Sequence, residues 1–354
     1  MKNKYFTVIL YLLLFLPLHV EGNDSITSKK VKILPVPAFG YSPETKTYIG
    51  GVCLFTFDFY RDSITRHSNA KIEFNYTWNK QMIIESGWNL FSKEEKWFTR
   101  GQIHYSKYPD YYYGIGSETS DTNKFAYTSN RFIFDISALK RVRNYLFTGV
   151  NVEYIRYWNV MPINNTTVSY SELTDNTTLG LGYSVLMDNR NSILSPTGGT
   201  YIYANSTYNF SKTNYWEFLF DVRYYKTWHD KYTIAGRFVN DINTGTPPFY
   251  DYAFLGGDKF VRGYYFGRYR DKNLSSLQLE FRLPVFWRFG LATFGGLSNL
   301  YPAVSAISMI NTKYNAGLGI RFMVNVKDKT NLRLDYAIGN DKNSGFYISF
   351  GESF

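Results

Sequence analysis

The chain has 354 residues and a formal net charge of +10, and aromatic residues make up 19% of it, including 33 tyrosines. A single cysteine, Cys53, excludes a disulfide framework. The mean hydropathy is slightly polar, and after residue 22 no apolar run approaches the roughly 20 residues that a membrane-spanning helix needs.

The N-terminal segment has the pattern of a secretory signal peptide. Lys2 and Lys4 precede an apolar run at residues 8–18, and Gly22 places a small residue at a cleavage point. An uncleaved anchor is the alternative, but the run is shorter than the roughly 20 residues of a stable span. We therefore expect the signal peptide to be residues 1–22, followed by a single exported domain at residues 23–354.

Hydrophobic alternation with a period of two recurs along the exported part of the chain. In residues 71–78 the apolar side chains occupy the even positions, and in residues 332–338 they alternate with Arg333 and Asp335. A soluble sandwich would turn the apolar face inward, whereas a barrel in lipid turns it outward and keeps its charges in a wet lumen. Together with the aromatic excess and the signal peptide, this alternation favours an outer-membrane β-barrel.

We predict an all-β fold, a barrel of sixteen antiparallel transmembrane strands, and single-chain bacterial barrels have even strand numbers. The predicted strands cover residues 32–41, 46–60, 67–78, 81–91, 96–107, 126–140, 144–159, 175–188, 199–210, 213–229, 231–243, 275–284, 288–298, 314–325, 330–340 and 344–354. With both chain ends in the periplasm, short connections fall inside and long ones fall outside. The connection at 188–198 is the exception, because it is long although it falls on the periplasmic side. Counting places residues 244–274 at the sixth surface loop.

Several short motifs follow one another along the chain. They are Tyr41-Ser42-Pro43-Glu44-Thr45 with Gly50; Tyr108-Pro109-Asp110 with Tyr113-Gly114-Ile115-Gly116; Asp188 with Ser195-Pro196-Thr197-Gly198-Gly199; Leu255-Gly256-Gly257 with Val261-Arg262-Gly263-Tyr264; and Gly317-Leu318-Gly319 with Arg333-Leu334-Asp335-Tyr336. Each motif alone is a weak signal. Their order and spacing resemble the BamA/TamA-like outer-membrane assembly barrels, also called the bacterial surface antigen family. In that family the motif at Asp188, Pro196 and Gly198 is a periplasmic turn.

The resemblance implies that the sixth surface loop folds back into the barrel and that its arginine, Arg262, pairs with acids on the lumen wall. Glu280 matches one family acid. The second family acid is replaced here by Gly296, so inward-facing Asp335 is the alternative partner. A confined arginine needs such a partner, and its planar fork suits a carboxylate. The competing interpretation is that Arg262 is a solvated loop cation.

An assembly barrel of this kind would use a labile seam between its first and last strands, where client strands or lipids pass. Gly339, Gly345 and Gly351 are expected to weaken pairing near that seam, although glycines also serve turns and tight packing. Only eight residues separate Gly22 from Val31. We therefore expect a barrel-only member of the family that lacks the periplasmic POTRA domains.

A lipase site is the main enzymatic alternative, and it would need a nucleophile, a histidine base and an orienting group. Only His104, with Ser106 on the same strand face, could begin such a site, and its surroundings do not resemble the barrel phospholipase signature. The histidines and Cys53 show no metal-ligand spacing, and phosphate-cradling motifs are missing. We therefore expect no enzyme, no cofactor and no metal.

Three non-enzymatic functions stay open. The first is an assembly or translocation barrel that works with separate periplasmic or membrane partners on client proteins. The second is a passive diffusion channel, and the third is a structural or lipid-perturbing barrel in an outer-membrane complex. Outer-membrane lipid is the expected surrounding, since a basic exported barrel suits anionic head groups, and nucleic acid is not an expected partner. The expected location is the outer membrane of a Gram-negative type of cell.

Overall fold

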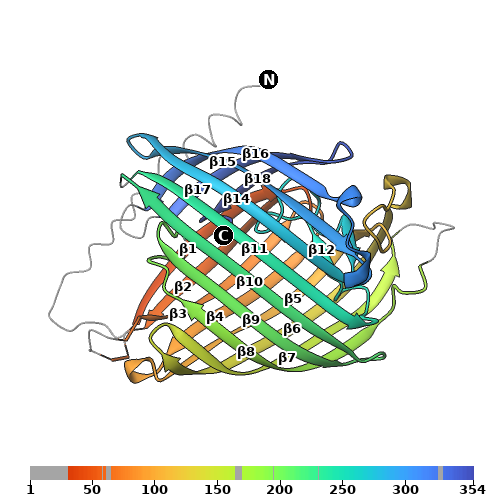
Figure 1. Cartoon of the computed structure of the whole chain (residues 1–354), viewed down its shortest axis with the longest axis horizontal. Helices are drawn as coiled ribbons and strands as arrows, with labels where there is room; N and C mark the ends of the chain where they lie inside the picture. The colour runs from red at the N-terminus through yellow and green to blue at the C-terminus, as the bar shows by residue number, and fades with distance from the viewer. Residues whose placement is uncertain are drawn as a thin grey trace. The chain divides into compact units, whose positions relative to one another are not determined.

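The computed structural model describes residues 31–57, 59–60, 65–163, 170–193, 195–229, 231–325 and 330–354. Sixteen of the strands form a closed antiparallel barrel, which confirms the predicted fold (Figure 1). Each barrel strand pairs with its neighbours along the chain, except that β11 pairs with β14, and β1 pairs with β18 to close the barrel. The predicted signal peptide lies outside the described residues.

The barrel strands are β1 Val31–Ser42, β2 Lys46–Phe57, β3 Ser68–Thr77, β4 Met82–Phe91, β5 Trp97–Tyr112, β6 Phe125–Arg143, β7 Leu146–Pro162, β8 Asn176–Asp188, β9 Gly199–Phe210, β10 Tyr215–Trp228, β11 Tyr232–Gly245, β14 Asn273–Phe286, β15 Phe289–Tyr301, β16 Lys313–Asn325, β17 Thr330–Gly339 and β18 Ser344–Phe350. Two short strands form a separate ribbon, β12 Ala253–Leu255 and β13 Tyr269–Asp271. The 3₁₀ helices are η1 Lys93–Glu95, η2 Asp121–Asn123, η3 Val304–Ala306 and η4 Met309–Asn311. In the part of the chain described above, no helix has the length and apolar character to cross a membrane.

The barrel is apolar outside and polar inside. On β3, Ile72, Phe74 and Tyr76 are 51%, 47% and 55% exposed, whereas Asn75 and Thr77 are buried. The alternation therefore turns its apolar face outward, as a barrel in lipid requires.

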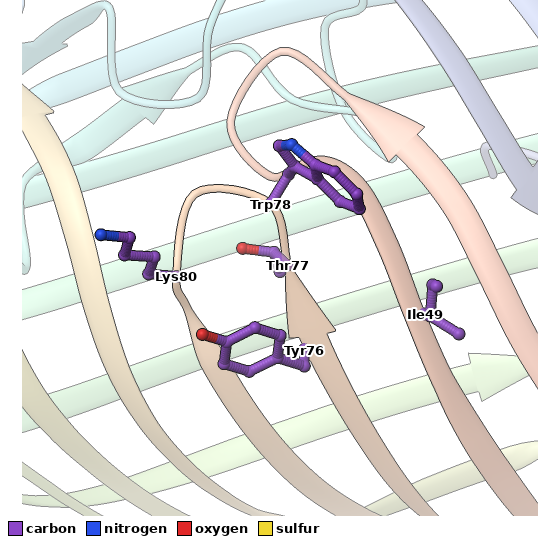
Figure 2. A pocket seen from close by; sticks show the side chains of 5 residues that line it. All are labelled: Ile49, Tyr76, Thr77, Trp78 and Lys80. Carbon is purple, nitrogen blue, oxygen red and sulfur yellow. The ribbon is translucent and has the colours of Figure 1, made fainter.

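The outer surface also carries an aromatic hollow near the turn between β3 and β4. Figure 2 shows its lining side chains, with the Trp78 ring and the Tyr76 ring on either side of Thr77 and Lys80 nearby. Trp78 is 76% exposed. Exposed Trp and Tyr at one end of the strands are typical of the aromatic girdle at a membrane interface.

The predicted strands match the observed ones in order but differ at several ends. β5 runs to Tyr112 and β6 begins at Phe125, because backbone pairing continues beyond the predicted ends until Tyr112 lies opposite Phe125. The short strands β12 and β13 were not predicted. They pair with each other inside the long loop, with Ala253 opposite Asp271, where no period-two pattern is long enough to reveal them.

The prediction that the last strand reaches residue 354 is wrong. β18 ends at Phe350, and Gly351 follows with φ = 78°, a left-handed conformation that glycine adopts readily. The chain then turns inward, and Phe354 is buried against Tyr225 of β10 and Ala235 of β11. The C-terminal residues therefore fill part of the lumen instead of extending the barrel wall.

Candidate functional site

The connection between β11 and β14 carries the predicted sixth-loop motif and packs against the lumen wall. The motif residues Leu255, Val261 and Tyr264 have no exposed surface, and they cluster with Leu274 of β14 and Leu300 of β15. The loop is therefore a packed internal element. It is not a free surface loop.

Glycines allow the loop to turn tightly and to approach the wall. Gly256 and Gly257 follow β12 with φ of 114° and 90°, values that favour glycine. Gly263, with φ of 107°, lies so close to β17 that a Cβ there would be 2.9 Å from the backbone oxygen of Ile338. A side chain at position 263 would therefore push the loop off the wall.

Arg262 lies between two carboxylates of the barrel wall. It is 2% exposed, and its guanidinium donates hydrogen bonds to Glu280 of β14 and to Asp335 of β17. The guanidinium carbon lies 3.4 Å from the centroid of the Phe294 ring, a cation–π contact that strengthens where water is excluded. The structure thus brings Arg262 together with both candidate acids, and it does not place Arg262 as a solvated cation.

Two arginines of the wall pair with the same acids. Arg282 Nε donates to Glu280 at 2.6 Å, and Arg321 donates to Asp335 at 2.5 Å. Both arginines also face Glu352 in the C-terminal tail, at 3.7 Å and 2.8 Å respectively. The inward turn of the tail therefore adds a third carboxylate to this site.

Arg333 connects the wall to the loop. It is fully buried and donates to Asp335 at 2.8 Å and to Asp258 of the loop at 2.7 Å. We call the complete set the arginine network. Its members are the arginines Arg262, Arg282, Arg321 and Arg333 and the acids Asp258, Glu280, Asp335 and Glu352. Their formal charges cancel, which is what the burial of charged groups requires.

The position of the missing family aspartate is occupied by a neighbouring side chain. Gly296 of β15 pairs with Gln278 of β14, and a Cβ on Gly296 would lie about 2.1 Å from Gln278 Nε2. Gln278 is buried and donates to Ser276. An aspartate at position 296 would displace the Gln278 side chain. The second carboxylate for Arg262 is Asp335 of β17.

Tyr264 fastens the end of the motif to β16 and β17. Its hydroxyl donates to the backbone oxygen of Tyr314 at 2.6 Å and accepts from the backbone N–H of Asn340 at 2.8 Å. A Cβ on Gly339 would lie 2.4 Å from the Tyr264 ring. Gly339 therefore leaves space for the Tyr264 ring. It lies on β17, one strand away from the seam that it was expected to weaken.

The motifs of the first hairpin and the third loop also touch the sixth loop. Glu44, in the turn after β1, accepts a hydrogen bond from the backbone N–H of Phe266 at 2.6 Å, and burial raises the pKa of Glu44. Asp110 of β5 accepts a hydrogen bond from Tyr265 at 2.8 Å. Motifs far apart in the sequence therefore converge on one loop.

The predicted periplasmic turn between β8 and β9 reaches the arginine network as well. Asp188 pairs with Arg190 at 2.8 Å, which orders the start of the turn. The backbone oxygen of Pro196 accepts a hydrogen bond from Arg282 at 3.1 Å. Gly198 lies in the same turn, one residue before β9.

The seam between β1 and β18 has a single paired position, Tyr41 opposite Ile348. In contrast, β1 and β2 are paired along their full length. Gly345 lies on the seam strand β18, where the Tyr347 hydroxyl occupies the space of its missing side chain, and Gly351 follows that strand. The backbone pairing is therefore weakest where the barrel closes.

The residues weighed for a lipase lie on β4 and β5. His104 Nε2 is 3.0 Å from Ser106 Oγ, and His104 Nδ1 is 3.8 Å from Glu85. Ser106 has no exposed surface, so a substrate carbonyl cannot reach its hydroxyl in this conformation. Within the described ranges, no three or more His, Cys, Asp and Glu side chains are grouped so as to hold a metal ion.

Five members of the arginine network were not predicted. The three wall arginines could have been found from the alternation, since Arg282, for example, is two residues from Glu280 and so faces the same side of the sheet. Asp258 and Glu352 lie in the loop and the tail, whose conformations no local pattern specifies.

The Omp85 superfamily domain matches residues 55–354. Among solved structures, BamA from Haemophilus ducreyi lacking POTRA domains 1–3 aligns with a TM-score of 0.61 and 13% identity, over 91% of this chain and 70% of that chain. CdiB from Acinetobacter baumannii aligns with a TM-score of 0.56 and 13% identity, over 91% of this chain and 60% of that chain, which is less than two thirds of CdiB. At these identities the likeness concerns the fold. No curated protein sequence matches the chain.

Proposed function

The chain belongs to the Omp85 superfamily, and from this premise we propose that it is an outer-membrane barrel that assembles or translocates client molecules together with separate protein partners. Its fold is typical of the outer membrane. The described residues are accounted for by the barrel and its connections, so recruitment of clients by this part of the chain would depend on partners.

The filled lumen is the observation that carries this proposal. The sixth loop and the C-terminal tail both occupy the interior, and the arginine network holds them there. A passive diffusion channel needs a continuous water-filled path, which this packing opposes. A client would pass at the seam, where one residue pair joins β1 to β18. We also propose that the barrel is not an enzyme, because Ser106 is buried.

Photo-crosslinking tests the seam directly. A photoreactive residue in place of Ile348 on β18 is expected to capture polypeptides in native membranes. The matched control is the same residue in place of Val150 on β7, which is 58% exposed on the outer face and is paired on both sides. Capture of lipid alone at both positions would remove the proposed role of the seam.

Conductance distinguishes the proposal from the diffusion channel. In planar bilayers the purified barrel is expected to show small, erratic openings, because the loop blocks the lumen. Arg262→Ala is expected to increase the conductance by loosening the loop. A large and steady conductance of the wild-type barrel would instead establish the diffusion channel.

A further inference from the structure

Four carboxylates that face the lumen have no cationic partner in the part of the chain that the structure describes. They are Glu153 of β7, Glu217 of β10, Asp241 of β11 and Asp251 of the sixth loop. We call them the acidic strip. Each keeps part of its surface accessible to solvent, so the strip borders space that water can enter.

The members of the acidic strip are close enough to repel one another. Tyr215, two residues before Glu217 on the same face of β10, donates a hydrogen bond to Asp251. A Cβ on Gly180 would lie 3.3 Å from the Cβ of Glu153 and 2.6 Å from Asn209 Oδ1. Glu217 lies opposite Asn243 in the β10–β11 ladder, and Asn243 Nδ2 donates to Asp241 at 3.2 Å. Without a counter-charge, this arrangement costs electrostatic free energy.

Two buried amides beside the acidic strip have acceptor oxygens without hydrogen-bond partners. Asn209 of β9 is fully buried, its amide N–H lies beside Glu217, and its Oδ1 has no hydrogen-bond partner among the described residues. Asn243 is 4% exposed, and its Oδ1 has no such partner either. Buried polar atoms are almost always paired. Unpaired acceptor oxygens beside carboxylates therefore indicate a missing donor.

We propose that the acidic strip binds an organic cation through ammonium or guanidinium groups. Ionised carboxylates accept hydrogen bonds and donate none, whereas these cations carry several N–H donors together with the positive charge that the strip lacks. The described His, Cys, Asp and Glu side chains do not converge enough to hold a metal ion. A polyamine or a basic peptide, in contrast, carries separated charges that can reach carboxylates on separate strands.

Protons compete for the same groups. Asp251 accepts a hydrogen bond from Tyr215, and burial raises the pKa of Asp251 to about 7. An unliganded acidic strip therefore holds part of its carboxyl groups in the neutral form at neutral pH. A cation that binds there displaces these protons, whereas a cation adsorbed on the outer surface does not.

Isothermal titration calorimetry of the full-length barrel in a non-ionic detergent tests the proposal. The probes are spermidine, a tetra-arginine peptide and Mg²⁺ at matched ionic strength. We expect saturable binding of spermidine or the peptide with proton release, seen as a dependence of the heat on the buffer. The double variant Glu217→Gln with Asp241→Asn is expected to bind about tenfold more weakly or worse. The control Glu118→Gln removes an exposed loop carboxylate and is expected to leave binding unchanged.

The outcomes separate cleanly. Binding of spermidine but not the peptide, or of the peptide but not spermidine, supports the site and shows whether it takes a polyamine or a basic peptide. The proposal is overturned by absence of saturable binding, by equal binding to the double variant, or by Mg²⁺ binding as tightly as spermidine. Asp251→Asn, a loop substitution outside the barrel wall, gives an independent measurement if the double variant does not fold.

Discussion

On the lumen face of β14, β16 and β17, buried arginines and acids pair with each other and with members from the sixth loop and the C-terminal tail, and the charges of this set cancel. On the neighbouring β11, on β10 and on β7, the carboxylates of the acidic strip have no cationic partner among the residues that the structure describes. Both regions lie in the same interior, so burial alone does not explain the difference. The arginine network, the paired side, holds the sixth loop in place. The acidic strip, the unpaired side, lowers the stability of the fold and is better explained by ligand binding than by folding.

The largest expected effect is on the paired side. Arg262→Ala leaves Glu280 and Asp335 with one cation fewer, and breaking a buried pair costs about 3–5 kcal/mol. Unfolding in urea, followed on semi-native gels, should therefore shift to a lower denaturant concentration. The matched control is Lys259→Ala, which removes an exposed cation of the same loop. Equal stability of the Arg262→Ala and wild-type barrels would contradict the bracing role of Arg262.

A pair of identical substitutions compares the two sides directly. Glu280→Gln removes a charge that Arg262 and Arg282 share, and we expect a loss of about 2–3 kcal/mol in the free energy of unfolding. Glu217→Gln removes an unpaired charge and is expected to be neutral or stabilising. The same urea titration measures both variants. If both lose stability equally, the distinction between the two sides is wrong.

The pH dependence of stability should report on Asp251. Its pKa is raised from 3.8 to about 7, so the folded barrel binds this proton more tightly than the unfolded chain. The resulting stabilisation is complete below about pH 4 and is lost as the pH rises toward 7, with a slope of at most about 1.4 kcal/mol per pH unit. Across this pH range, the urea midpoint of unfolding of Asp251→Asn should decline less than that of the wild-type barrel. Parallel curves would show that Asp251 does not contribute.

The smallest effect is expected at the end of the motif. Tyr264→Phe keeps the ring over Gly339 but removes the hydroxyl that bonds Tyr314 and Asn340. We expect a loss of about 1 kcal/mol, measured by the same urea titration. A loss as large as that of Arg262→Ala would mean that the tyrosine, and not the arginine network, dominates the attachment of the loop.

Much of the site was predictable because its geometry follows from strand alternation. Glu280 and Asp335 occupy inward positions of strands that the period-two pattern identified, and the strand count placed Arg262 in the sixth surface loop. The sequence offered Glu280 and Asp335 as partners of Arg262, but it could not show that both contact the guanidinium. Nor could it show that Gln278 fills the space at Gly296, a contact between two paired strands.

The sequence by itself determined the closed barrel of sixteen strands, its apolar outer face and the inward position of the loop motif's acids, because alternation and turn spacing are local properties of the chain. Only the tertiary structure decided how the charges pair, where the C-terminal tail turns and which carboxylates stay without cations. These features depend on side chains from distant strands meeting in one lumen. Arg262 and Asp335, for example, are 73 residues apart in the chain, and no local pattern specifies their contact.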